Sequence, residues 1–408
     1  MIRRPGFVLA ILAGLNLLNY VDRTVLAAVL PRVSAVHDKG GLGLDKLQAG
    51  ALATAFLIGY FATSPIFGTL ADRAPRLRTR LMTVGVLVWS IATFLSGRAD
   101  GFWSMVGARA LVGVGEASYA AVAPTLIDDM GENGRSRRLA IFYMAIPVGS
   151  ALGFVLGGFL ETKVGWRGAF QFVGAPGAIL ALSCLLIFDR GAEEHSKHVR
   201  PAVLKMLAPL AKQKLYARAV LGYAAQTFAL GGFQHWAPTY IEGRHHFDLD
   251  RANYVFGAIL VVAGFVGTFA GGAWGERAAR GLDRLGAARA HVRICAISAI
   301  LGAPFAFAAV LAPSAVLFFA FIFVCIVFVF LSTSPINGAI LGAVPIELRA
   351  SGMALSTFSI HMLGDLWSPP LVGRISDATH SMTLAMLLLP AAIAVSAVIW
   401  LRREQTAG

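Results

Sequence analysis

Two ionisable residues, Asp22 and Arg23, stand side by side in the apolar segment LLNYVDRTVLAAVLP, residues 17–31. An arginine guanidinium binds carboxylate or phosphate groups through paired hydrogen bonds, and a carboxyl group can take up and release a proton. Neighbouring residues on a helix point about 100° apart, so these two side chains must serve different partners. The pair predicts an anion-binding cation next to an acid that carries a proton.

Polar residues at helical spacing extend the face that carries Arg23. Asn16, Asn19 and Tyr20 precede Arg23 by seven, four and three residues, so a helix places all four on one side. Ionisable and polar groups are rare inside apolar spans and usually mark a functional site. We therefore expect Asn16, Tyr20 and Arg23 to contact a bound anion, and Asp22 to take part in proton coupling.

Two other apolar segments repeat this arrangement of charged side chains. Arg109 and Glu116 are seven residues apart, and Tyr119 follows one turn later. Further along, His361 and Asp365 are four residues apart on one helical face. We expect Glu116, Tyr119 and His361 to join the binding site, together with Asn337 of the segment STSPINGA, and Glu116 to share the proton role with Asp22.

A purely structural interpretation of these side chains stays open. Arg23 with Glu116, or Arg109 with Asp22, would also suit fixed ion pairs that hold helices together. His361 would equally suit a packing histidine, and Tyr119 is more typical of a core aromatic residue than of a ligand.

The composition places these residues in a membrane. Hydrophobic residues make up 57% of the 408 positions, charged residues only 14%, and the mean hydropathy is +0.69. Apolar runs of about 20 residues, each long enough to cross a bilayer, recur along the chain. The first run carries Asp22 and Arg23 and has no small-residue cleavage site, so it is not a cleaved signal peptide. The predicted helices are 7–30, 48–71, 81–97, 102–130, 137–161, 168–189, 215–240, 252–276, 291–311, 314–344, 350–374 and 381–401.

Charge in the loops predicts the orientation. Most of the 35 Lys and Arg residues fall at the termini and in the loops that follow even-numbered spans. The positive-inside rule then puts both termini in the cytoplasm, and we expect a plasma (inner) membrane location. Because the net charge of +13 is spread over short loops, nucleic acid is not an expected partner. The long basic connection 191–214 is expected to be a cytoplasmic linker between the bundles 1–190 and 215–408.

An internal repeat supports two halves. GTLADR, 68–73, follows the second span and GAWGER, 272–277, follows the eighth, an offset of half the chain. Six spans followed by six in parallel repeat are typical of transporters that bind substrate near the membrane midplane. The fold class is therefore an all-α membrane protein with twelve helices in two pseudo-symmetric six-helix bundles.

The motifs resemble the major facilitator superfamily. GTLADRAPRLRTR, 68–80, resembles its loop signature with Pro75 in place of a usual glycine, and RALVGVGEA, 109–117, resembles its fourth-span signature. The segment 334–377, which ends in HMLGDLWSPPLVGRISD, is similar to the spinster group of lysolipid and sphingolipid transporters. The short chain suggests a bacterial homologue.

The resemblance implies secondary active transport by alternating access. The substrate would be an amphiphilic anionic lipid, either a lysophospholipid or a sphingoid phosphate, and protons are the expected coupling ion. The 68–80 loop would act as a conformational latch in which Asp72 faces the positive N-terminus of the eleventh span, near Arg349, and Arg73 pairs with Asp128 or Asp129. The residues expected to serve conformational gating are Asp72, Arg73, Arg76, Arg109, Asp128, Glu276, Arg349 and Asp365.

Two other functions compete with lipid transport. A proton-coupled symporter of a small organic anion or sugar acid would share Arg23 and Glu116 but needs a small polar pocket. An intramembrane enzyme would need a nucleophile beside a base, and no serine or cysteine stands in such a motif, so we expect no enzyme activity. The three cysteines lie singly in apolar runs, and we expect no metal, no cofactor and a monomer in the bilayer.

Overall fold

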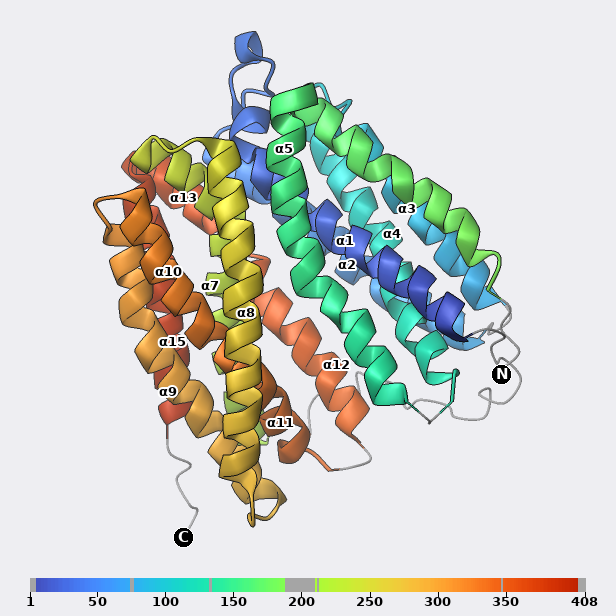
Figure 1. The fold of residues 1–408 in the computed structure, drawn as a ribbon, viewed down its shortest axis with the longest axis vertical. Helices are drawn as coiled ribbons and strands as arrows, with labels where there is room; N and C mark the ends of the chain where they lie inside the picture. The colour runs from blue at the N-terminus through green and yellow to red at the C-terminus, as the bar shows by residue number, and fades with distance from the viewer. Residues whose placement is uncertain are drawn as a thin grey trace. The chain divides into compact units, whose positions relative to one another are not determined.

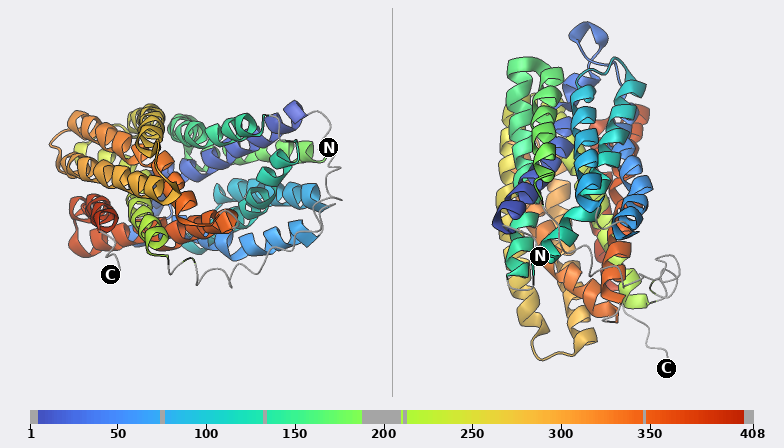
Figure 2. Two further views of the ribbon diagram at one scale, coloured as in Figure 1. Left: turned by 90° about the horizontal axis from the view of Figure 1, so that it is seen from below. Right: turned by 90° about the vertical axis from the view of Figure 1, so that its right-hand side faces the viewer.

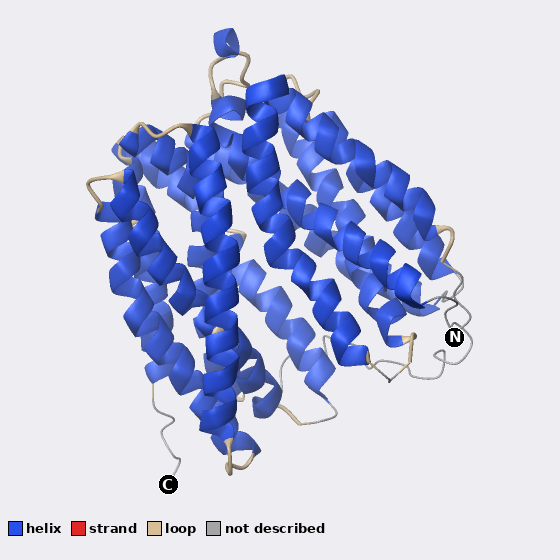
Figure 3. Cartoon of the chain, in the orientation of Figure 1, coloured by secondary structure: helices blue, strands red, loops and turns tan. Residues whose placement is uncertain are grey.

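The computed structural model describes residues 5–73, 77–131, 134–187, 210, 213–345 and 348–402. In these ranges the chain is helical and contains no strand (Figure 3). It divides into two compact units, which we call the N-terminal unit (1–199 with 248–257) and the C-terminal unit (200–247 with 258–408). The predicted linker 191–214 lies almost entirely outside the described residues.

Five long helices build the N-terminal unit: α1 (Pro5–Ser34), α2 (Lys46–Arg73), α3 (Arg78–Ser96), α4 (Phe102–Asp128) and α5 (Arg135–Cys184). A short 3-10 helix, η1 (His37–Lys39), follows α1. Helix α1 packs along α5, while α2 and α3 flank α4 (Figure 1). This packing brings the charged faces of α1 and α4 into one bundle.

The 50-residue helix α5 contains two of the predicted spans. Its direction changes at Gly165, which has φ 71° and ψ 172°, a backbone conformation that glycine adopts without steric cost. A loop was predicted between residues 161 and 168, and this prediction was wrong, because a single glycine makes the turn.

Gly113 and Gly115, in the segment GVGEA, allow α4 to pack closely against its neighbours. A methyl group on Gly113 would overlap the carbonyl oxygen of Phe56 in α2, and one on Gly115 would overlap that of Gly85 in α3. Small residues at such positions let helix backbones approach closely inside a membrane. They hold the segment that carries Glu116 against α2 and α3.

The C-terminal unit contains α7 (Lys214–His245), α9 (Arg284–Leu311), α10 (Ala315–Leu331), α11 (Thr333–Ala343), α12 (Arg349–Ile360), the π-helical turn η6 (His361–Asp365), α13 (Ser368–Thr379), α14 (Met382–Met386) and α15 (Leu388–Leu401). Helix α8 (Leu249–Ala279) begins in the N-terminal unit and continues in the C-terminal unit.

Two predicted spans of the C-terminal unit are interrupted. The span 314–344 is broken at Ser332, where α10 ends and α11 begins. Gln226 of α7 forms two hydrogen bonds at this break. Its amide nitrogen donates to Val329 O at 2.7 Å, and its side-chain oxygen accepts from the Ser332 hydroxyl at 2.9 Å. The span 350–374 is interrupted at η6, where Gly364 leaves helical geometry. Both breaks lie inside continuous apolar runs, so the apolar pattern of the sequence did not predict them.

The packing pattern repeats between the units. Helix α1 packs on α5 in the first unit, and α7 packs on η6 and α12 in the second. In the same way, α9 packs on α15 in the second unit, as α3 packs on α5 in the first. The right-hand view of Figure 2 shows the helices running up and down, side by side. The fold class predicted from the sequence, an all-α membrane protein of two helical bundles, is confirmed, whereas the predicted bounds 1–190 and 215–408 stay a prediction.

Within the described ranges, nine helical segments are long and apolar enough to cross a membrane. One of them is the Arg137–Cys184 segment, which Gly165 divides into two spans. The less apolar α7, and α12 with α13, complete the twelve spans of the fold.

Candidate functional site

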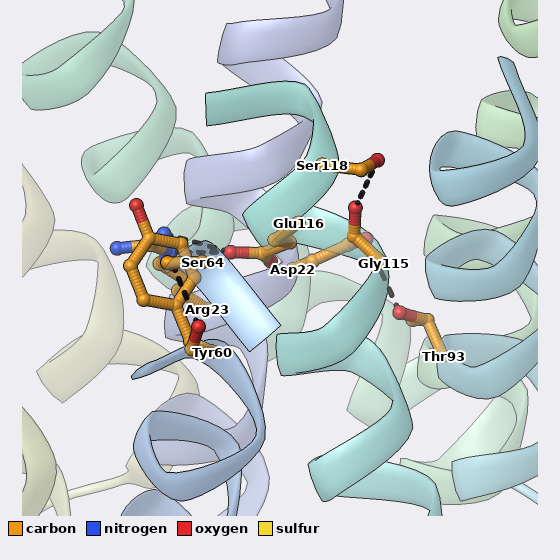
Figure 4. A network of polar contacts seen from close by, with 8 residues as sticks. All are labelled: Asp22, Arg23, Tyr60, Ser64, Thr93, Gly115, Glu116 and Ser118. Atoms are coloured by element: carbon orange, nitrogen blue, oxygen red, sulfur yellow. Dashed lines mark hydrogen bonds and ion pairs between the residues drawn. The ribbon is translucent and has the colours of Figure 1, made fainter. Parts of the chain in front are cut away.

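Asp22 and Arg23 of α1 and Arg109 and Glu116 of α4 form what we call the charged cluster of the N-terminal unit. An ion pair between α1 and α4 lies at its centre. Arg23 Nη2 lies 2.7 Å and Arg23 Nε 2.8 Å from Glu116 Oε2 (Figure 4). The Glu116 side chain is fully buried, whereas that of Arg23 is 25% exposed. The predicted contact between these residues is therefore present, and the arginine still has surface with which to meet a ligand.

Aromatic rings surround the Arg23 guanidinium. Its Cζ lies 5.0 Å from the ring centre of Tyr20, 4.9 Å from that of Phe56 and 5.5 Å from that of Tyr60. The negative face of an aromatic ring attracts a cation at these distances. Arg23 is thus held by rings from α1 and α2 as well as by Glu116.

Asp22 points away from Arg23. The Thr93 hydroxyl of α3 donates to Asp22 Oδ2 at 3.2 Å, on the other side of the cluster from Tyr60 (Figure 4). The carboxylate is buried, and no described group donates to its Oδ1. This arrangement agrees with the expectation that Asp22 and Arg23 serve different partners.

Arg109 is a buried cation in the same cluster. Its guanidinium lies 5.5 Å from the ring centre of Phe56, and its side chain is 2% exposed. Among the described residues, none accepts a hydrogen bond from its Nε or Nη1, and none of the described ion pairs joins it to Asp22. The suggested fixed pair of Arg109 with Asp22 is therefore absent.

Two residues expected to bind substrate are instead part of the helix packing. The buried amide of Asn16 donates to Phe142 O at 2.9 Å and links α1 to α5. The buried Tyr119 hydroxyl donates to Leu12 O at 2.5 Å and links α4 to α1. The polar groups of Asn16 and Tyr119 are therefore used inside the bundle, and their roles in substrate binding stay predictions.

In the C-terminal unit, His361 and Asp365 are paired. His361 Nδ1 lies 2.8 Å from Asp365 Oδ1 and 3.0 Å from its Oδ2, and both side chains are partly exposed. The pair spans the π-helical turn, and Asp365 therefore orients the imidazole. Asn337 donates to Thr333 O at 2.9 Å within its own helix. Roles for His361 and Asn337 in substrate binding stay predictions.

One predicted latch contact, that of Arg73 with Asp129, is not found among the described contacts, while the alternative pairing of Arg73 with Asp128 stays a prediction. Asp129, at the end of α4, pairs with Arg78 Nη2 at 2.6 Å, and both are buried, whereas Arg73 is exposed. Arg78 is the first residue of α3 and lies beside the end of α4, so its guanidinium is placed to bind the Asp129 carboxylate. Glu276 is exposed on α8, 3.5 Å from Arg280 one turn along, which is a surface contact.

Other parts of the latch are not described. Arg76 and the side chains of Asp72 and Asp128 lie outside the described residues, so the predicted contact between Asp72 and Arg349 stays a prediction.

Three residues around the charged cluster were not predicted from the sequence: Phe56, Tyr60 and Thr93. Arg78, which pairs with Asp129 at the end of α4, was also not predicted. Phe56 and Tyr60 are four residues apart on the second span, a signal that would have placed two aromatic rings on one face. Thr93 gave no such signal, because a single threonine in an apolar span more often bonds to its own helix.

Comparisons with known proteins identify the family. The sequence profile of the Major Facilitator Superfamily matches residues 12–369. "Probable sphingolipid transporter spinster homolog 2" of Arabidopsis thaliana is 33% identical over 97% of this chain and 86% of its own length. The chain belongs to the spinster group of the major facilitator superfamily. "Protein spinster homolog 1" of Homo sapiens is 32% identical over 92% of the chain and 73% of its own length.

Solved structures share the fold of this spinster-group protein. A bacterial homologue of the human lysosomal transporter spinster, in an inward-facing and occupied conformation, matches with a TM-score of 0.80 and 20% identity over 97% of this chain and 96% of that one. The chain is a multi-pass membrane transporter of the spinster type and does not belong to an enzyme class.

Proposed function

We propose that this spinster-type transporter is a secondary active transporter of an amphiphilic anionic lipid, a lysophospholipid or a sphingoid phosphate. It works by alternating access with protons as the coupling ion. Its location is the plasma (inner) membrane, with both termini in the cytoplasm. The name of the Arabidopsis relative, a probable sphingolipid transporter, supports this substrate class.

The observation that carries the proposal is the state of Arg23. It is the partly exposed member of an otherwise buried charged cluster, and its guanidinium is fixed by Glu116 and aromatic rings. A guanidinium whose orientation is already set gives up little conformational entropy when it binds a phosphate with two hydrogen bonds. The substrate headgroup would then replace Glu116 as the partner of Arg23.

The apolar and aromatic surroundings favour a lipid over a small polar anion. Phe56 and Tyr60 place aromatic rings beside the guanidinium from α2, a mostly apolar wall that suits a lipid better than a sugar acid with many hydroxyl groups. Tyr20 adds a phenol next to the headgroup position. A small organic anion remains the alternative substrate and is an arm of the test.

The test is direct binding by purified protein in detergent, with sphingosine phosphate, a lysophospholipid and a hexuronate as separate ligands. We expect the two lipids to bind and the hexuronate not to bind. Arg23→Ala should weaken lipid binding about 10- to 100-fold, as expected for a lost hydrogen bond to a charged group. Arg280→Ala, a change at an exposed arginine, is the matched control and should leave binding unchanged. Binding of hexuronate alone would overturn the lipid assignment.

A further inference from the structure

The C-terminal unit carries a group of exposed arginines where α8 turns into α9. Arg277 and Arg280 lie at the end of α8, and Arg289 and Arg293 lie in the first turns of α9. All four side chains are exposed, and we call them the arginine patch. No part of the proposed transport function uses these residues, so the patch requires its own explanation.

The two helices that carry the patch meet at this end. Helix α8 ends at Ala279 and α9 begins at Arg284, so a short turn joins them (Figure 1). The Nε2 atom of His291 in α9 lies 3.3 Å from the carbonyl oxygen of Gly275 in α8, which shows that the helices are in contact there. The four arginines therefore belong to one end of a closed helical hairpin.

Acidic side chains near the patch neutralise only part of its charge. Glu276 lies 3.5 Å from Arg280, and both side chains are exposed to solvent. Asp283 is engaged in capping, because its carboxylate accepts from a backbone N–H at the start of α9 at 3.0 Å. Among the described residues, neither Arg277 nor Arg293 has a side-chain ion pair or hydrogen bond. This end of the hairpin is thus left with an excess of positive charge.

The arginines of α9 lie on the face of that helix that meets the membrane. Ile297, Ile300 and Leu301 are exposed apolar residues that follow Arg293 by four, seven and eight positions, a spacing that puts them on one helical face. The uncharged run from Arg293 to Leu311 is roughly 28 Å long, close to the ~30 Å thickness of the bilayer hydrocarbon core. Arg293 is therefore placed at the depth of the lipid headgroups.

The arginines of α8 end a similar apolar stripe. Val266 and Phe269 are exposed, and Arg277 and Arg280 follow them by eleven residues each, which is close to three full helical turns. Trp274 is exposed just before the arginines, and tryptophan is enriched where a membrane protein crosses from hydrocarbon to water. Both helices thus change from apolar to arginine along one membrane-facing surface.

We propose that the arginine patch binds the phosphate headgroups of anionic phospholipids in the leaflet around the α8–α9 turn. A guanidinium binds a phosphate through two hydrogen bonds, and each basic residue near an anionic membrane surface strengthens binding about fivefold. A lipid fits better than a free phosphate, because the apolar stripes beside the patch contact acyl chains. The bound lipid belongs to the surrounding bilayer and is distinct from the substrate assigned to Arg23.

The experiment measures which phospholipids stay bound to the protein. Full-length protein in detergent is titrated with phosphatidylglycerol or with phosphatidylcholine of the same acyl chains, and native mass spectrometry counts the bound lipids. Wild type should bind phosphatidylglycerol more tightly than phosphatidylcholine. Arg289→Gln combined with Arg293→Gln should weaken phosphatidylglycerol binding about 30-fold, because two charges are lost, and should leave phosphatidylcholine binding unchanged.

Two matched variants test whether positive charge at this position is the cause. Arg289→Lys combined with Arg293→Lys keeps the charge and should retain most of the phosphatidylglycerol binding. Arg98→Gln combined with Arg251→Gln removes the same charge from exposed arginines outside the patch and should leave binding unchanged. The proposal is wrong if wild type binds both lipids equally, if the control variant loses as much binding as the patch variant, or if the lysine variant binds as weakly as the glutamine variant.

Two further measurements identify the bound ligand and its site. Inorganic phosphate at millimolar concentration should not displace phosphatidylglycerol, and displacement would assign the patch to free anions and overturn the lipid proposal. Under the proposed function Arg23 also binds an anionic lipid, so the patch variant is measured again with Arg23→Ala. The patch substitutions should cause the same loss in that background, whereas complete loss by Arg23→Ala alone would place the lipid in the substrate site. Failure of wild type to bind sphingosine phosphate would reject the proposed substrate and leave the patch proposal unaffected.

Discussion

Asp22 and Arg23 are consecutive in the chain, but their side chains bond to different helices. Arg23 contacts Glu116 of α4 at 2.7 Å, while Asp22 accepts from Thr93 of α3 at 3.2 Å. Helix α1 thus sends a cation to one side and an acid to the other (Figure 4). In the proposed function, this separation would let substrate and proton act on adjacent residues without competing for one atom.

The hydrogen bond to Asp22 gives the first prediction. Thr93→Val keeps the side-chain shape but removes the donor to a buried carboxylate. We expect the free energy of unfolding to fall by about 1–3 kcal/mol, the usual cost of leaving a buried polar group unbonded. Thermal or denaturant unfolding in detergent measures it. Thr162→Val, whose hydroxyl bonds to Phe159 O within its own helix at an exposed position, is the control and should change little.

Close packing of α4 on α2 gives the second prediction. Gly113→Ala places a methyl group on the carbonyl oxygen of Phe56 and should destabilise the protein by about 1–3 kcal/mol. It should also weaken lipid binding, because a displaced α2 moves the ring of Phe56 away from Arg23. Gly107→Ala on the same helix meets open space and is the matched control. Equal effects of the two substitutions would contradict the packing explanation.

The pair between α3 and α4 gives the third prediction. Arg78 and Asp129 are both buried, so Arg78→Ala removes a cation that lies 2.6 Å from a buried carboxylate and should cost about 3–5 kcal/mol of folding stability. The same change at Arg280, in an exposed pair with Glu276, should cost less than about 1 kcal/mol. Unfolding curves of the two variants test the difference. A small loss for Arg78→Ala would mean that the pair is dispensable for stability.

The fourth prediction concerns His361. If the imidazole meets the lipid headgroup, His361→Gln should weaken sphingosine phosphate binding about tenfold, the typical effect of losing a hydrogen bond to a charged group. Asp365→Asn should have a smaller effect, since the ring stays in place but loses its orienting carboxylate. His37→Gln, in an exposed turn, serves as the control. Unchanged binding by His361→Gln would assign His361 to packing.

The sequence determined the fold class and the helical faces. The length of the apolar runs predicted the spans, and the GTLADR and GAWGER segments predicted the internal repeat. Spacings of three, four and seven residues predicted which polar side chains share a helical face. These features are local, because a helix fixes the direction of each side chain from its position along the chain. The same logic predicted that Asp22 and Arg23 diverge.

Tertiary structure alone decided which polar groups meet. Asn16 and Arg23 share a helical face by sequence, yet the neighbour of Asn16 is the Phe142 carbonyl of α5, and that of Arg23 is Glu116. Asp129 bonds to Arg78 because α3 begins beside the end of α4. The breaks at Ser332 and η6 depend on packing against α7 and not on apolar periodicity. Long-range packing selects the partners, and local spacing determines only which partners are possible.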